Sequence, residues 1–168
     1  MRGRITGSVT ITDNASITCV SNDEEGIYVS AGYGCLTVSG NANVYAVGGK
    51  EGLDAENVSV TGGTVTAIGG VDCEGIFADD LTITGGTVTA SGDDQGIEAE
   101  NITITGGTVT ITGGGMIASV GETMTPGTIT LTDVEIVEPQ GATIDTMELE
   151  DEGTVKAILN ADGTYADA

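Results

Sequence analysis

One phrase of eleven residues recurs three times in this chain and constrains its fold more than any other feature. The copies are ENVSVTGGTVT at 56–66, DDLTITGGTVT at 79–89 and ENITITGGTVT at 100–110. Glycine followed by an apolar residue recurs in step with them, at positions 26, 52, 75 and 96. A period of about 22 residues is typical of a solenoid, in which each repeat forms one coil.

Apolar and polar residues alternate within each copy, which is the period of a β-strand. In residues 97–112, isoleucine, alanine and valine alternate with polar residues on both sides of the Gly106-Gly107 pair. Glycine pairs suit sharp corners, because one residue at such a corner often needs a positive φ. The pattern therefore predicts three short strands per coil, and stacked coils would form a right-handed parallel β-helix.

The repeat divides the chain into three parts. Regular coils span residues 26–115, a partial coil or cap precedes them at 1–25, and irregular coils or a cap follow at 116–168. We expect a single all-β domain of roughly six coils. Because an open solenoid end is an unpaired sheet edge, weak caps would permit end-to-end association of chains.

Charge excludes several classes of partner. The chain has 26 acidic residues against four basic ones, a formal net charge of −22. Such a charge repels nucleic acid and anionic lipid, and no stretch approaches the length of about 18 apolar residues that a membrane span needs. The start, MRGRITGSVT, is basic but lacks the apolar region of a secretory signal. Cys19, Cys35 and Cys73 lack metal-binding spacing and are interpreted as incidental thiols.

Stacking in register would turn acidic positions into columns of carboxylates. Unit charges about 4.8 Å apart repel by roughly 0.9 kcal/mol in water, and a divalent cation between them would remove that repulsion. Calcium prefers oxygen ligands in acidic, glycine-rich turns, and the absence of histidine argues against a nitrogen-ligated transition metal. The alternative is that these acids are solvated turn residues. The candidate calcium ligands are Glu56, Asp72, Glu74, Asp79, Asp93, Asp94, Glu98 and Glu100.

Outward aromatic residues and threonine columns suggest two further surfaces. Tyr28 and Phe77 occupy an outward position that is acidic on other coils, and an outward ring can stack on a sugar. Threonine is favoured on strand exteriors, but a flat array of threonines could also match an ice lattice. The candidate carbohydrate-binding residues are Tyr28, Asp54, Phe77, Thr87 and Thr108.

Catalysis is not expected from this sequence. Hydrolysis of a glycosidic bond needs two or three carboxylates at a set separation, one of which acts as an acid. A lyase of the β-helix type needs an arginine or lysine base. The regular coils contain neither arginine nor histidine, and their only lysine is Lys50 at their border. Their acids follow the repeat instead of gathering in one unlike cluster.

Two segments resemble a known family. SGDDQGIEAENITITGGTVTITGG at 91–114 and GLDAENVSVTGGTVTA at 52–67 are similar to repeats of clostridial-type extracellular β-helix proteins that bind carbohydrate and calcium. In that family an Asp-Asp-Gly-Ile turn precedes an Asn-Ile-Thr-Ile-x-Gly-Gly-Thr-Val-Thr strand pair. The resemblance covers about residues 26–115. It implies a right-handed β-helix, calcium in the acidic turns, and non-catalytic binding of pectate or cellulose.

The family's acid pair is present in some coils only. Asp93 and Asp94 match it by position. Asp72 and Glu74 match less closely, because Cys73 stands between them. The pair is lost in residues 49–51, where the resemblance puts a calcium site in doubt.

We therefore expect calcium-dependent binding of a plant cell-wall polysaccharide, pectate (polygalacturonate) or cellulose, at the bacterial surface or outside the cell. An acidic protein repels pectate unless calcium bridges the two, so a chelator should abolish that binding. The competing hypotheses are a structural or adhesive segment without a sugar site and, with less support, an ice-binding protein that uses its threonine columns.

Overall fold

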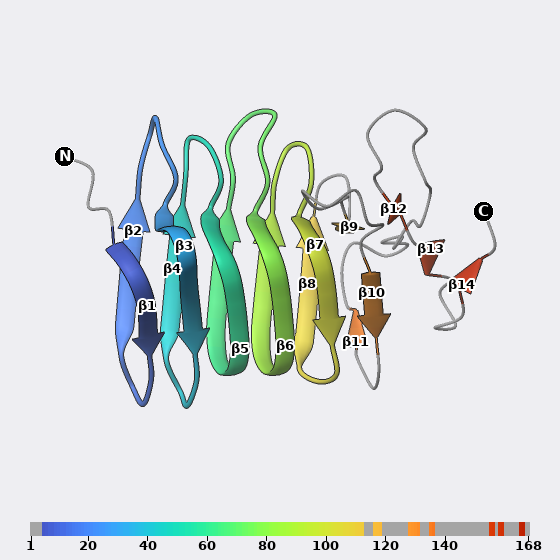
Figure 1. Cartoon of the computed structure of the whole chain (residues 1–168), viewed down its shortest axis with the longest axis horizontal. Helices are drawn as coiled ribbons and strands as arrows, with labels where there is room; N and C mark the ends of the chain where they lie inside the picture. Colours follow the sequence, from blue (N-terminus) through green and yellow to red (C-terminus); the bar gives the residue numbers. More distant parts are fainter. Residues whose placement is uncertain are drawn as a thin grey trace.

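The computed structural model describes residues 5–112 and several short strands that follow, namely 116–118, 128–131, 135–136, 155–156, 158–159 and 165–166. Side chains are described for 7–29 and 34–112. Figure 1 shows coils stacked side by side along one axis, in chain order from blue to yellow. No helix is present among the described residues, and none of them forms a helix capable of crossing a membrane.

Some coils contain two strands, whereas the strands Leu53–Ile68 and Ile76–Ser91 each continue through the glycine corner of their coil. The strand bounds are β1 (Ile5–Ile11), β2 (Ser16–Val20), β3 (Ile27–Val38), β4 (Asn43–Val47), β5 (Leu53–Ile68), β6 (Ile76–Ser91), β7 (Ile97–Ile104) and β8 (Thr108–Thr112). Shorter strands follow: β9 (Met116–Ala118), β10 (Thr128–Leu131), β11 (Glu135–Ile136), β12 (Val155–Lys156), β13 (Ile158–Leu159) and β14 (Tyr165–Ala166). All pairings among β1–β11 are parallel, whereas β12 pairs with β9 and β13 with β14 in the antiparallel direction.

The predicted fold is confirmed: the chain is an all-β, right-handed parallel β-helix. Leu53 pairs with Ile76 and Ile76 with Ile97, steps of 23 and 21 residues. The predicted count of roughly six coils includes residues 113–168, most of which lie outside the described part of the chain.

Each regular coil bends twice, so that three ladder segments follow one another. In β5 the pairing with β6 passes from Ala55 to Asn57 without Glu56, and two outward residues stand next to each other there. The second bend is the Gly62-Gly63 corner, which interrupts the register again. The strand assignment of β5 continues through both bends over 16 residues, where the sequence pattern predicts three separate strands.

The core is a set of apolar columns inside the coils. Within the described residues its largest members are fully enclosed isoleucines, leucines and valines, including Leu53, Ile76 and Ile97 in one column and Val58, Leu81 and Ile102 in another. Stacking removes one face of every strand from water, and this burial is the main stabilising term. The inward positions match the alternation expected from the sequence.

The glycine pairs form the corners, as predicted. The second glycine of each pair has a positive φ: 80° at Gly63, 88° at Gly86 and 92° at Gly107. Residues with a Cβ rarely adopt this conformation. A Cβ at Gly86 would also lie 2.7 Å from the backbone oxygen of Gly63 on the neighbouring coil.

We expect Gly86→Ala to lower the free energy of unfolding by about 2 to 4 kcal/mol, because backbone strain and a clash with the next coil act together. Urea titration followed by circular dichroism measures the change. Gly7→Ala is the control, since Gly7 has a φ of 106° but nothing within 4 Å of its added Cβ. Equal losses in the two variants would mean that the close stacking at the corner contributes nothing.

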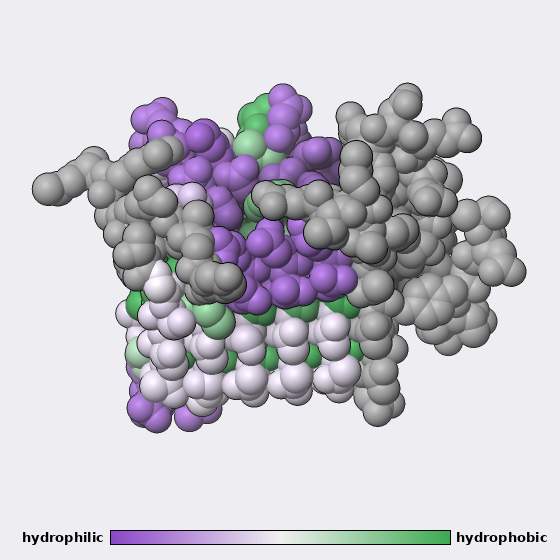
Figure 2. All heavy atoms as spheres, in the orientation of Figure 1, coloured by the Kyte–Doolittle hydropathy of each residue, from purple (hydrophilic) through white to green (hydrophobic). Residues whose placement is uncertain are grey.

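Uncharged hydroxyl side chains cover the front strands. Thr37, Ser59, Thr82 and Thr103 form one outward column across β3, β5, β6 and β7. Figure 2 shows this face as a pale band, with hydrophilic residues gathered above it. The preference of threonine for the exterior of strands accounts for this surface. Ice binding by the threonine columns stays a prediction.

Candidate functional site

Acidic turns line one edge of the solenoid, at the top of Figure 1. Backbone hydrogen bonds hold successive turns in register: the amide of Gly26 donates to the carbonyl of Glu51 at 3.0 Å, and that of Gly52 to Glu74 at 3.1 Å. The residue before each glycine therefore stacks on its equivalent in the next coil. This places Glu25, Glu51 and Glu74 in one column.

Three carboxylates of this edge converge. Glu25, Glu51 and Asp54 each offer one oxygen, and the three oxygens lie within 4.8 Å of one another. All three residues are half-buried. A donor set made entirely of carboxylate oxygens suits a hard divalent cation such as calcium.

A single lysine lies at the end of this cluster. The Nζ of Lys50 is 2.9 Å from Oε2 of Glu24 and 3.8 Å from Oε1 of Glu25. The ammonium therefore offsets charge mainly at Glu24. Since Lys50 is the only basic residue in the regular coils, most of the negative charge on this edge has no basic counterpart there.

Two carboxyl groups on this edge hold their protons to unusually high pH. Burial raises the pKa of Asp54 from 3.8 to about 7, with further increases from the charges of Glu51, Glu25 and Asp79. Burial also raises the pKa of Glu74 to about 7, a backbone hydrogen bond at Glu74 opposes this, and Glu98, Glu51 and Asp94 add to it. Both shifts arise because a half-buried carboxylate among like charges is costly to ionise.

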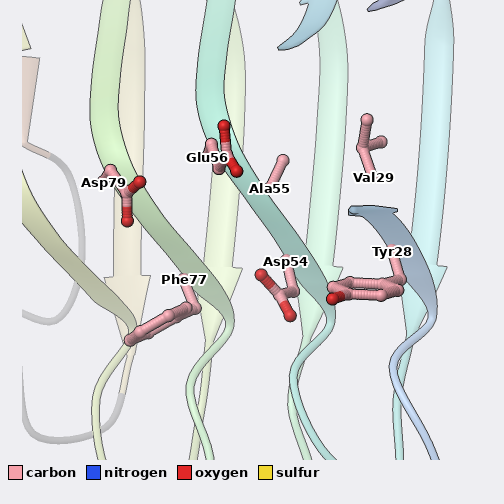
Figure 3. Close-up of a pocket in the computed structure, with 7 residues that line it drawn as sticks. All are labelled: Tyr28, Val29, Asp54, Ala55, Glu56, Phe77 and Asp79. Atoms are coloured by element: carbon pink, nitrogen blue, oxygen red, sulfur yellow. The ribbon is translucent and has the colours of Figure 1, made fainter. Parts of the chain in front are cut away.

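A surface pocket of about 230 Å³ adjoins the cluster. Figure 3 shows Asp54 between Tyr28 and Phe77, with the tyrosine ring extending toward the Asp54 carboxylate. The three residues occupy one column, because Tyr28 pairs with Asp54 and Asp54 with Phe77. Phe77 is 38% exposed, so part of its ring is accessible from solvent. The remaining lining residues are Val29, Ala55, Glu56 and Asp79.

Asp54 belongs to both the carboxylate cluster and the pocket, and so links them. Glu56 is oriented by the backbone, since its Oε2 accepts a hydrogen bond from the amide of Gly34 at 3.1 Å. An ion bound by the cluster would thus lie beside a cavity that has an aromatic side and an acidic side.

The structure brings some predicted site residues together and separates others. Tyr28, Asp54 and Phe77 meet in the pocket, where Glu56 and Asp79 join them. Thr87 and Thr108 pair with each other beyond the glycine corner and do not line the pocket.

The remaining predicted metal ligands are distributed over the neighbouring coils. Asp72 and Asp93 are both exposed, and the amide of Asp72 donates to Oδ2 of Asp93 at 3.4 Å. Glu98 and Asp94 lie near enough to Glu74 to raise its pKa. Glu100 is half-buried in the column of Glu56 and Asp79, one coil further along.

None of the three cluster residues belongs to the predicted set of calcium ligands. The sequence predicts Asp54 only as a carbohydrate-binding residue, and it predicts Glu25 and Glu51 only as members of an acidic column. A sequence signal for this cluster does exist. Glu51 and Asp54 stand three residues apart with Gly52 between them, and Glu25 occupies the position of Glu51 in the preceding coil. The three cysteines, Cys19, Cys35 and Cys73, are free thiols.

Comparison with protein-family models, curated proteins and solved structures returns no match for this chain.

Proposed function

We propose that this chain is a non-catalytic, calcium-dependent binder of plant cell-wall polysaccharide that acts outside the cell or at the cell surface. The observation that carries the proposal is the shared position of Asp54, which joins the oxygen cluster to the aromatic pocket. Glu25, Glu51 and Asp54 would hold the ion, and calcium would supply a positive charge to which an acidic sugar can bind.

Electrostatics favours an ion-bridged ligand over direct binding. The chain carries a net charge of −22, and the pocket adds Glu56 and Asp79 to Asp54. A polygalacturonate chain would be repelled from this surface without calcium, whereas a bound ion with open coordination positions would accept its carboxylate oxygens. Tyr28 and Phe77 would contact the apolar faces of the sugar rings.

A neutral glucan such as cellulose would use the same pocket differently. It has no carboxylate for calcium to bridge, so its binding would depend on Tyr28 and Phe77 and on hydrogen bonds to the acidic side chains. Binding of the two polysaccharides would therefore respond differently to a chelator.

The proposal is tested by retention on insoluble pectate in calcium and then in chelator. We expect retention in calcium, at least a tenfold loss in chelator, and a similar loss for Asp54→Asn in calcium. Asp13→Asn removes the same charge from an exposed turn and should bind like the unmodified chain. Calcium-independent retention on cellulose that Phe77→Ala abolishes would favour the neutral glucan. Retention on neither material would contradict the proposal and favour a structural role.

A further inference from the structure

The carboxylate cluster has an equivalent two coils along the solenoid. In the first cluster, Glu25 precedes the glycine of one coil and Glu51 precedes the glycine of the next coil. Asp54 follows Glu51 by three positions. Moving this pattern by one coil places Phe77 at the third position, where it supplies no ligand. Moving it by two coils gives Glu74, Gln95 and Glu98.

Backbone pairing places these three residues in the equivalent geometry. The amide of Gly75 donates to the carbonyl of Gln95 at 3.0 Å, which repeats the bond between Gly26 and Glu51. Phe77 pairs with Glu98, as Tyr28 pairs with Asp54. Gln95 therefore continues the column of Glu74, and residues stacked in one column project the same way.

Gln95 has an unsatisfied oxygen. The residue is only 8% exposed, and it is the one buried polar side chain in the described part of the solenoid. Its Nε2 donates to Oδ1 of Asp94 at 3.2 Å, whereas its Oε1 has no hydrogen-bond partner among the described residues. A buried carbonyl oxygen without a partner is costly, and such a group calls for a partner such as a bound water or an ion.

Gln95 stands in an acidic stretch, since Asp94 precedes it and accepts its side-chain hydrogen bond, and Glu98 follows three positions later. The charges of Glu98 and Asp94 both act on the half-buried Glu74 carboxyl. An amide carbonyl among carboxylates is a common ligand set for calcium. A cation bound to Oε1 would leave the hydrogen bond from Nε2 to Asp94 in place and would also offset the charge of the nearby carboxylates. The missing partner of Oε1 is therefore better supplied by a cation than by an anion or an apolar group.

We propose a second divalent-cation site formed by Glu74, Glu98 and the Oε1 of Gln95. The inference rests on the proposed function only for the identity of the ion as calcium. Two coils separate this site from the Asp54 cluster, about 10 Å at the usual strand spacing, and Phe77 lies between them. A polysaccharide chain that lies along the solenoid axis would then contact two ions and one aromatic ring.

Calcium titration of the full chain tests this site without any sugar. Isothermal titration calorimetry at about 0.15 M salt, where diffuse attraction is screened within about 8 Å, gives the number of ions bound. We expect two ions per chain on this edge, one of them lost in Gln95→Met and the other in Asp54→Asn. Gln95→Glu keeps the oxygen and adds charge, so it should retain both ions and bind the second at least threefold more tightly.

Each outcome decides between the two sites. If Gln95→Met and Gln95→Glu both bind calcium like the unmodified chain, the second site is wrong, while loss in Asp54→Asn would leave the proposed function intact. If Gln95→Met loses one ion while Asp54→Asn binds calcium like the unmodified chain, the second site is supported and the first is contradicted. A chain that binds no calcium contradicts both. Thermal melting of each variant in chelator separates a lost ligand from a lost fold, because a lost ligand leaves the metal-free melting temperature within a few degrees.

Discussion

Without calcium, the protein is expected to lose stability as the pH rises from about 4 to about 7. The pKa values of Asp54 and Glu74 are about 7 in the folded chain, against 3.8 and 4.5 for ordinary carboxyl groups. The folded state thus binds more protons than the unfolded state between these limits. A raised pKa contributes stability that is fully present below the unfolded value and is lost as the pH passes the folded value.

The expected loss is about 1 to 2 kcal/mol, a value reduced for solvent screening because both carboxyl groups are partly exposed. For a chain of this size it corresponds to a fall in melting temperature of roughly 2 to 8 °C. Circular dichroism melts in chelator at pH 4.5, 5.5, 6.5 and 8 measure it. Calcium at a hundred times its Kd should add about 2.7 kcal/mol of stability per bound ion at pH 8.

Other acids repel one another as the pH rises, so a control must isolate these two groups. Asp54→Asn and Glu74→Gln should each flatten the fall between pH 5 and 7, whereas Asp13→Asn, at an exposed turn, should leave its slope unchanged. A melting temperature that rises over this range in the unmodified chain would contradict the predicted ionisation of Asp54 and Glu74.

Leu81→Ala is expected to destabilise the protein by about 2 to 5 kcal/mol. Leu81 is 1% exposed and lies in the interior column between Val58 and Ile102 on the adjacent coils. Since those neighbours are held by their own coils, they cannot close fully around the cavity, and the loss should lie in the upper half of that range. Urea unfolding measures it.

The adjacent residue provides a matched control. Thr82 lies on the same strand but faces outward, so Thr82→Ala should change stability by no more than about 0.5 kcal/mol. Similar effects at both positions would contradict the inward and outward assignment of the whole strand. The same pair of variants also tests whether the hydroxyl column contributes to stability.

The solenoid could be predicted because its two signals are local and repeated. Alternation determines which side of each strand is buried, and the Gly-Gly pairs determine where the chain turns, so Val88 and Ile104 could be assigned to the core from the sequence. The continuity of β5 through Glu56 could not be predicted from the sequence, because it depends on how neighbouring coils pair on both sides of the bend.

The candidate site was predictable only in part. Columns follow from the repeat, so the alignment of Tyr28, Asp54 and Phe77 and the stacking of acids could be anticipated. The coils differ in length, however: Tyr28 pairs with Asp54 after 26 residues, and Asp54 with Phe77 after 23. The additional residues of the longer coil lie mainly within β3, where the register with β5 shifts between Val29 and Cys35.

The sequence by itself determined the β-helix, its apolar interior and its acidic edge, because each depends on residue type at a fixed position of the repeat. Only the tertiary structure decided which acids converge. Glu25, Glu51 and Asp54 meet because two turns of different length stack with their backbones in register. The same stacking buries Gln95 with one oxygen unsatisfied, because the depth of a side chain depends on the coils on either side of it.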